Sequence, residues 1–295
     1  MILRLSAVLA VVVSLLAGCQ PPQPIVPEVL LPEPINNDQP IPTYQELIER
    51  YNRTLQPLDR LWAEARVDLD WINEKGDRKH EHGDGKFMFV RPNRVALQIE
   101  EFGKGFWAGA DGLHYWLFEL ADTRTAYVGR FDRLDQHDTD TFPLPVRPTD
   151  LLYVLGLKPI DPTLVPSEPA VEQVAGHYLI EPPGLGIRLL LHPETARPVR
   201  VDILNPRGES VVKCVLSETV PVRNQEGETG VGRIASQVEV YVLGREARMT
   251  LQLKQPEVGS SRIRDAHFDF DTLMKVYKPD RVVDLDAEIS PQSGR

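Results

Sequence analysis

The sequence predicts a mostly antiparallel β protein that begins with one α-helix. Three observations support this fold class. Apolar side chains alternate with period 2 between Gly83 and Leu120, short turn motifs interrupt that alternation, and a second series of strands follows at regular spacing from Gln173 to Lys254. With 295 residues, 42% of them hydrophobic and 26% charged, the chain is long enough for one large β-rich domain or two small ones.

Charge and cysteine content exclude two classes of protein. The net charge is -10, the pI is near 5.3, and no Lys/Arg cluster provides the basic face that a nucleic-acid surface needs. The two cysteines, Cys19 and Cys214, are too few for a disulfide framework unless they pair with each other. Cys214 lies in an apolar strand, which predicts a small buried hydrophobic residue rather than a nucleophile.

Residues 1–18 have the pattern of an export signal. Arg4 precedes an apolar run that is too short to span a bilayer, although an uncleaved anchor helix is the alternative. The ending Leu16-Ala17-Gly18-Cys19 is similar to the lipobox of bacterial lipoproteins. This resemblance implies cleavage before Cys19 and its modification with diacylglycerol and a third acyl chain such as palmitate. Because residue 20 is Gln and not Asp, it further implies the outer membrane, with the outer face of the inner membrane as the alternative.

The lipidated cysteine is followed by a proline-rich stretch. Residues 19–42 form neither a helix nor a central strand, so they predict an extended tether, for which a docked strand is the alternative. At about 3.1 Å per residue, such a tether reaches roughly 70 Å from the membrane. Residues 43–287 are predicted to form the folded domain, and residues 288–295 a disordered tail.

The domain opens with a helix and a long strand. Thr43 and Glu46 have the spacing of a capping box, and apolar residues follow at helical intervals. Residues 58–72 then alternate like a strand, and residues 73–85 read as a polar turn. His80-Glu81-His82 in that turn places two imidazoles on one side. A metal site is one interpretation, but with no third ligand nearby we expect a solvated hairpin tip.

The central region predicts a meander. Its turns are Arg91-Pro92-Asn93, Gly103-Lys104-Gly105 and Asp111-Gly112. A strand at 123–131 follows, then a short helix from Arg147 to Leu157 with Thr149 as a possible cap. Further strands are predicted at Gln173–Glu181, Leu185–His192, Val199–Leu204, Ser210–Ser217, Arg233–Leu243 and Glu246–Lys254, with a polar loop at Asn224–Gly232.

Three motifs give the chain its resemblance to a known family. These are Arg91-Pro92-Asn93, the Asp111-Gly112 turn that opens an aromatic strand, and the ending with Phe268 and Phe270 before a last short strand. Together they resemble the LolA/LolB fold of periplasmic carriers and acceptors of bacterial lipoproteins. The resemblance implies an incomplete, half-open β-barrel of about 11–12 strands. It also implies a short helical lid over the concave apolar face, and a strand running through Phe268 and Phe270.

The pattern and the resemblance together define candidate site residues. Strand parity predicts a lipid-binding cavity lined by Phe87, Phe89, Val95, Leu97, Ile99, Trp107, Tyr115 and Leu117. A plain apolar core is the alternative for each. Helical spacing predicts lid residues Leu151, Leu152 and Leu155. The resemblance implies that Arg91 is a latch that bonds the lid backbone; the alternative is a solvated arginine at the end of a strand. It also implies that Phe102 or Phe106 contacts the membrane; the alternative is that both are ordinary buried residues beside a turn.

These expectations lead to one function and two alternatives. The first is a lipid-anchored periplasmic lipoprotein that binds acyl chains of lipids or lipoproteins, for lipoprotein localisation or lipid transport. The second is an envelope sensor or scaffold with the same fold. A hydrolase is the third, but the sequence holds no motif for a nucleophile, metal or phosphate loop. We expect a monomer without a cofactor, whose partners are acyl chains, the membrane and other envelope proteins.

Overall fold

The computed structural model describes residues 32–72, 76–100, 105–120, 123–136, 142–167, 170–244 and 247–287. The export signal, Cys19, Phe102, most of the Gly103-Lys104-Gly105 turn and the tail at 288–295 therefore lie outside the described residues. Within the described ranges, no helix is long and apolar enough to cross a membrane.

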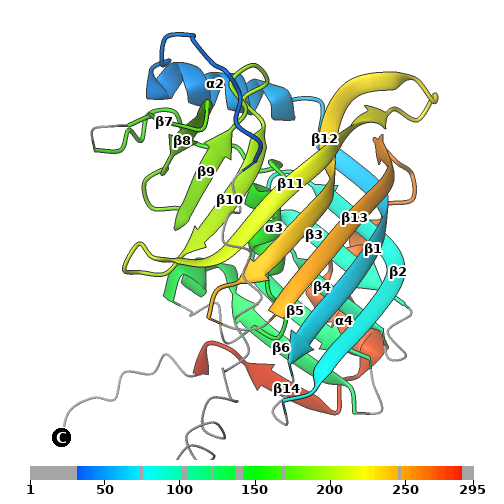
Figure 1. Ribbon diagram of the computed structural model, residues 1–295. Helices are drawn as coiled ribbons and strands as arrows, with labels where there is room; N and C mark the ends of the chain where they lie inside the picture. Colours follow the sequence, from blue (N-terminus) through cyan, green and yellow to red (C-terminus); the bar gives the residue numbers. More distant parts are fainter. Residues whose placement is uncertain are drawn as a thin grey trace, which may run out of the picture.

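The described strands form one fourteen-stranded sheet that does not close on itself (Figure 1). The spatial order is β14-β6-β5-β4-β3-β2-β1-β13-β12-β11-β10-β9-β8-β7. The strands are β1 (Arg60–Ile72), β2 (Arg78–Val90), β3 (Arg94–Ile99), β4 (Phe106–Ala110), β5 (His114–Glu119), β6 (Thr125–Arg130), β7 (Glu172–Val174), β8 (His177–Ile180), β9 (Ile187–Leu191), β10 (Pro198–Leu204), β11 (Ser210–Arg223), β12 (Thr229–Val242), β13 (Ala247–Val258) and β14 (Arg281–Asp284).

This sheet confirms the predicted fold class, with more strands than expected. Neighbouring strands are antiparallel except for β14 beside β6 and a single parallel pair between β11 and β13. One added strand arises because the segment predicted as Gln173–Glu181 is a hairpin. Its turn consists of Ala175 and Gly176, both of which have positive φ. A two-residue turn of this kind matches the twist of the strands that it joins.

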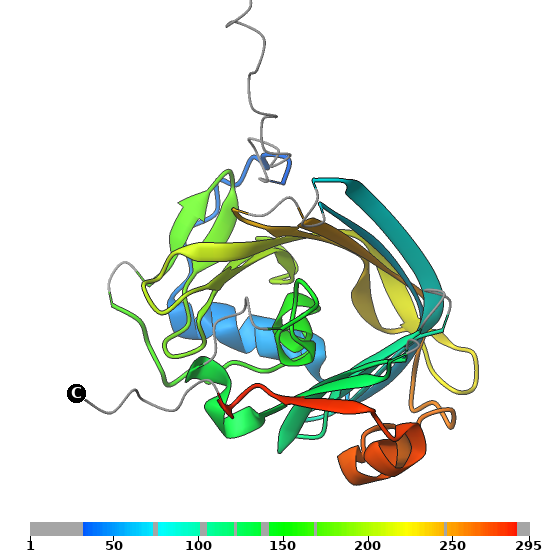
Figure 2. The same cartoon turned by 90° about the horizontal axis from the view of Figure 1, so that it is seen from below.

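One helix lies across one end of the curved sheet, a second lies inside the sheet, and a third lies outside it (Figures 1 and 2). They are α2 (Tyr44–Leu55), α3 (Pro148–Val154) and α4 (Phe270–Tyr277). The predicted start of α2 is confirmed: the Glu46 backbone N–H donates to the Thr43 hydroxyl (3.3 Å), and the Thr43 N–H donates to the Glu46 carboxylate (2.9 Å). Short 3-10 helices occupy Phe131–Gln136 and Asp265–His267.

The sheet carries an apolar cluster on each face. The inner cluster joins α2 and α3 to the concave face, while the outer cluster joins the convex face of β1–β6 to α4. Alternation along β5 divides its residues between the two: Tyr115 and Leu117 belong to the inner cluster, and Trp116 and Phe118 to the outer one. Hence β5 is buried on both sides, which is why its sequence reads as a continuous apolar run.

Several local predictions were wrong. His80 and His82 lie in β2 and not in a turn, since Asp70 and Asp68 of β1 pair with them across the ladder. The polar loop at Asn224–Gly232 is a tight turn closed by the Asn224 side chain, and the flanking residues belong to β11 and β12. Such polar strands resemble loops in sequence because their outward faces are solvated over most of their length.

Two helix boundaries also differ from the prediction. The cap of α3 is Arg147 and not Thr149, because Pro148 takes the first helical position, where its missing N–H costs nothing. Phe268 and Phe270 do not form a strand: Asp269 caps α4 through the Thr272 N–H, and Phe270 is the first residue of that helix. The final short strand is confirmed as β14.

The end of the proline-rich stretch lies against the sheet. The Ile35 N–H donates to the Ala175 carbonyl (3.0 Å), and the Asn37 side-chain amide donates to the Gly176 carbonyl (3.0 Å). The Gln173 side chain in turn donates to the Asn37 carbonyl (2.9 Å). These three bonds hold residues 35–37, the strap, on the β7–β8 hairpin, so this part of the predicted tether is docked.

Candidate functional site

The candidate site is the concave face of the half-barrel. Seven of the eight predicted cavity residues belong to the inner cluster, and none of them is more than 2% exposed; they are Phe87, Phe89, Val95, Leu97, Ile99, Tyr115 and Leu117. Trp107 is the exception. It points to the convex face, where its ring lies 5.7 Å from that of Tyr277 in α4. Parity explains the error, because Phe106 and Ala108 of the same strand take the inward positions.

The predicted lid helix lies inside the half-barrel (Figure 2). All seven residues of α3 are buried, and the helix contacts β3, β4, β5 and β10. Leu151, Leu152 and Leu155 belong to the inner cluster. An isolated helix of this length is unstable in water, so α3 depends on its apolar surroundings. The helix therefore lies within the space that the concave face encloses, the hollow, and does not cover its open end.

One polar group of side chains accompanies α3 into this apolar interior. The Arg147 Nε donates to Asp150 Oδ2 (2.7 Å) and Nη2 to Oδ1 (3.2 Å), a two-pronged ion pair whose side chains are only 10% and 8% exposed. The Thr149 hydroxyl is buried and has no hydrogen-bond partner among the described residues. Arg147, Thr149 and Asp150 form the polar cluster, for which the i,i+3 spacing of Arg147 and Asp150 is the signal in the sequence.

The charges of the polar cluster affect the pKa values of two other side chains, Tyr115 and Cys214. Burial raises the pKa of the Tyr115 phenol above its ordinary value; the Arg147 guanidinium lowers it, and Asp286 and Asp150 raise it. Burial also raises the pKa of the Cys214 thiol well above its ordinary value, with Asp150 and Asp202 adding to the effect. Tyr115 is on β5 and Cys214 on β11, so Asp150 influences both sides of the hollow. Cys214 is buried and unpaired, which confirms the prediction of a small buried residue.

Arg91 holds the end of a different helix from the predicted one. Its Nη2 donates to the carbonyl of Leu55, the last residue of α2, and its backbone N–H donates to the Asp59 carbonyl (2.8 Å). The guanidinium thus bonds the end of α2, where the prediction expected α3. The last carbonyls of a helix have no donor within the helix, and the Arg91 guanidinium donates a hydrogen bond to one of them. Arg91 therefore ties the β2–β3 turn to α2.

The predicted membrane-contact loop is only partly described. Phe106 is 7% exposed and packs in the inner cluster, so it is not an exposed membrane contact. Large exposed apolar side chains occur instead at Leu113 (72%), Leu164 (52%) and Val165 (56%). The last two lie in the segment that follows α3.

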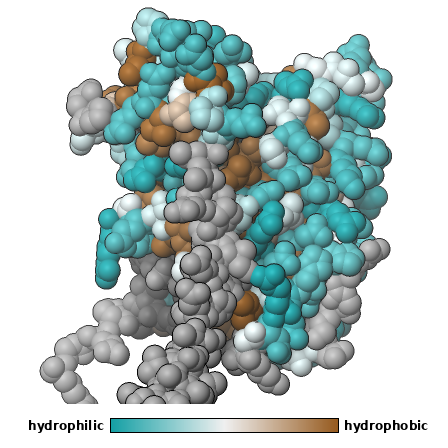
Figure 3. Space-filling model, viewed as in Figure 1, coloured by the Kyte–Doolittle hydropathy of each residue, from teal (hydrophilic) through white to brown (hydrophobic). Residues whose placement is uncertain are grey.

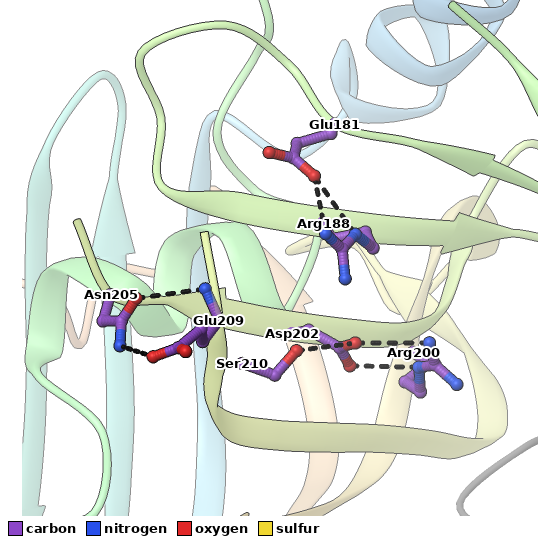
Figure 4. A network of polar contacts seen from close by, with 7 residues as sticks. All are labelled: Glu181, Arg188, Arg200, Asp202, Asn205, Glu209 and Ser210. Atoms are coloured by element: carbon purple, nitrogen blue, oxygen red, sulfur yellow. Dashed lines mark hydrogen bonds and ion pairs between the residues drawn. The ribbon is translucent and has the colours of Figure 1, made fainter. Parts of the chain in front are cut away.

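A second group of polar side chains lies on the opposite face of the sheet, across β8–β11 (Figure 4). Arg188 pairs with Glu181 (2.8 Å) and Arg200 with Asp202 (3.0 Å). Both arginines line an open groove of about 780 Å³ whose rim includes Val165 and several prolines. Because each guanidinium has its own carboxylate, the groove has no excess positive charge from these two residues. Sequence patterns do not reveal this group, since alternation alone does not show which polar side chains meet across strands.

The outer surface of the long strands is polar. Over β1, β2 and β13, hydrophilic side chains predominate (Figure 3). His80 Nδ1 lies 2.9 Å from Asp70 Oδ1, and the side chains there are about half exposed. In the described ranges, no three His, Cys, Asp or Glu side chains are grouped so that they could hold a metal ion.

The fold and the site together define a class: an open antiparallel half-barrel with an apolar concave face and a buried helix within it. The chain is similar in structure to a DUF1329 family protein from Desulfovibrio piger (TM-score 0.51, 14% identity, 78% of this chain and 97% of that one). It is equally similar to a domain from Vibrio parahaemolyticus provisionally assigned to outer-membrane lipoprotein sorting (TM-score 0.51, 12% identity, 78% and 97%). A LolA superfamily protein, NE2245 from Nitrosomonas europaea, aligns with a TM-score of 0.49 (11% identity, 78% and 99%).

No protein-family model and no curated protein matches this sequence. At identities this low, structural similarity shows the fold alone. The chain thus shares its fold with the Desulfovibrio piger protein and the Vibrio parahaemolyticus domain, and the predicted fold class is confirmed.

Proposed function

We propose that this protein is a periplasmic lipoprotein, anchored through Cys19 to the outer membrane, that binds acyl chains of lipids or lipoproteins inside its half-barrel. Its role is lipoprotein localisation or lipid transport. The observation that carries the proposal is the position of α3: a short helix of mostly apolar side chains occupies the concave face, where an acyl chain would find the same surroundings. The fold shared with the Vibrio parahaemolyticus domain and the lipobox support it.

The energetics favour exchange between α3 and an acyl chain. Burying one methylene contributes about 0.8 kcal/mol, so one long chain compensates for the lost burial of a few leucine side chains. The helix spans seven residues. Its own stability is small, and displacing it therefore costs mainly its packing. In this mechanism α3 fills the hollow when the protein is empty and leaves it when a lipid enters.

The docked strap shortens the reach of the anchor. With residues 35–37 held on the β7–β8 hairpin, the linker between Cys19 and the strap comprises residues 20–34. About 15 extended residues at about 3.1 Å each span about 45–50 Å, instead of roughly 70 Å for a fully free tether. The half-barrel would thus remain near the membrane to which Cys19 attaches it.

Native mass spectrometry of the protein purified from membranes in mild detergent tests the proposal. Lipid on Cys19 is covalent and survives denaturation, whereas a lipid in the half-barrel is lost on denaturation. We expect native mass peaks that exceed the denatured mass by one or more acyl lipids. Identical native and denatured masses, also after incubation with vesicles of bacterial lipids, would contradict lipid binding.

One observation favours the second candidate, an envelope scaffold without transport. Every residue of α3 is buried in the present conformation, as expected if the helix never leaves. A cross-link distinguishes the two: a photoreactive amino acid at Leu152 cross-links to β-strand peptides only if α3 stays in place, and to lipid in vesicles if it is displaced.

A further inference from the structure

The buried ion pair between Arg147 and Asp150 is unexpected in a cavity for acyl chains alone. The Arg147 side chain is only 10% exposed and the Asp150 side chain only 8%. Removing two charges from water is costly, and well-packed apolar side chains often serve stability equally well or better. Hydrocarbon chains form no favourable contact with either charge. The pair therefore indicates that the interior also receives a polar group.

A second observation points the same way. The Thr149 hydroxyl is buried, with the residue 2% exposed, and it has no hydrogen-bond partner in the described ranges. Buried hydroxyls without partners are rare in proteins because their desolvation is not compensated. A ligand atom that accepts a hydrogen bond would satisfy it. Arg147 caps α3, and Thr149 and Asp150 lie in its first turn, so the hydroxyl and the ion pair are at the same end of the helix.

We propose that the polar cluster recognises the phosphate of a glycerophospholipid, and that phospholipids rather than lipoproteins are the ligand of this half-barrel. The inference rests on the proposed function and specifies its substrate class. A guanidinium binds phosphate and carboxylate with the same two-pronged geometry, so the Asp150 carboxylate holds the place of the phosphate in the empty protein. On binding, phosphate oxygens accept from Arg147 and Thr149 at the start of α3, while the acyl chains take the part of the inner cluster that the displaced helix leaves.

The chemistry of the two ligand classes separates them at this site. The acylated cysteine of a lipoprotein carries ester and amide groups but no phosphate, so it offers Arg147 no second anion. A phosphodiester compensates the guanidinium when Asp150 is displaced. Lys at position 147 would keep the charge but lose the two-pronged bond, because an ammonium group acts as a point charge.

The test compares two probes with identical fluorescent acyl chains, a phosphatidylglycerol and a diacylglycerol, bound to the full protein in detergent micelles. We expect the wild type to bind the phosphatidylglycerol at least tenfold more tightly. We expect the double variant R147M/D150L, which replaces the ion pair by apolar side chains of similar size, to bind both probes equally while unfolding at the same or higher urea concentration. T149V should reduce the preference several-fold.

Further outcomes decide between this inference and its competitors. Equal binding of both probes by the wild type, or an undiminished preference in R147M/D150L, overturns the phosphate assignment but leaves acyl binding intact. Binding of neither probe contradicts the proposed function itself. If the double variant does not fold, R147K takes its place, with a weakened preference as the expected result and an unchanged one as the contrary result. Inorganic phosphate alone should neither bind nor compete; competition by it at millimolar concentration would assign the cluster to a free anion instead.

Discussion

The guanidinium of Arg91 donates a hydrogen bond to the backbone carbonyl of Leu55 and so ties the turn between β2 and β3 to the last residue of α2. Leu55 is buried, and it belongs to the inner cluster with the rest of the apolar face of α2. One side chain thus connects a corner of the sheet to a helix that covers the hollow. This bond defines the first prediction.

Replacing Arg91 by Leu should release the end of α2. The Leu55 carbonyl loses a charged donor, and we expect the free energy of unfolding to fall by about 1.5–3 kcal/mol, measured by urea denaturation. If the bond also keeps the hollow closed, R91L should retain more co-purified lipid than the wild type. The control is R130L, because Arg130 pairs with Asp132 at an exposed site and should change stability by less than about 0.5 kcal/mol. Equal stability of R91L and R130L would contradict the role of the bond.

Adjacent residues of β5 allow a test of which face binds lipid. Leu117 points into the hollow and Phe118 to α4, and each is 1% exposed. Both L117A and F118A should lose about 2–5 kcal/mol of stability, measured by urea denaturation. Only L117A should change acyl-chain affinity in a binding titration with a fluorescent fatty acid. The same affinity change in both variants would mean that the effect arises from stability and not from the site.

The strap can be detached by one methyl group. Gly176 has φ +82°, and a Cβ atom there would lie 1.9 Å from the Ile35 carbonyl oxygen. We expect G176A to free residues 35–37, measured as faster proteolysis near Ile35. G208A is the matched control: Gly208 has φ +78° but open space around its Cβ position, so it carries only the conformational cost of about 1 kcal/mol. Equal proteolysis near Ile35 in both variants would show that the strap does not depend on this contact.

Stability should decrease as the pH falls below about 6.5. Burial lowers the pKa of His177 below its ordinary value of 6.5; its bond to the Ala175 carbonyl opposes this, and His192 adds to it. The unfolded chain then binds a proton more readily than the folded one, so protonation favours unfolding. Burial lowers the pKa of His267 as well, which acts in the same direction.

Melting temperatures measured from pH 7.5 to 5 check this expectation. The decrease should be smaller in H177Q than in the wild type, while H82Q, which alters an exposed side chain, should follow the wild type. A pH dependence in H177Q as steep as that of the wild type would rule out His177 as its source.

Thiol titration reports on both cysteines. Because Cys214 is fully buried and burial raises its pKa, it should not react with a thiol reagent until the protein unfolds. If Cys19 is acylated, the folded protein purified from membranes should show no reactive thiol, and the protein in urea should show one. A second thiol in urea would contradict acylation of Cys19.

Local sequence signals determined much of this architecture. Thr43 and Glu46 marked the start of α2, Asp111-Gly112 marked a turn, and period-2 alternation assigned Phe87, Phe89 and Leu117 to one face. Each of these features depends on neighbours in the chain, through a capping bond, a backbone angle or the pleat of a strand. The same signals failed for Trp107, because β4 is apolar on both faces and alternation cannot say which face is concave.

Contacts between distant segments were decided only by the tertiary structure. That α3 lies within the hollow, that Arg91 bonds α2, and that Ile35 meets Ala175 all depend on how far the sheet curves. This curvature results from the accumulated twist of many strands, to which each residue contributes little. The sequence by itself thus determined the elements and their apolar faces. The contacts around the hollow form only once all strands are paired, because packing is a property of the whole sheet.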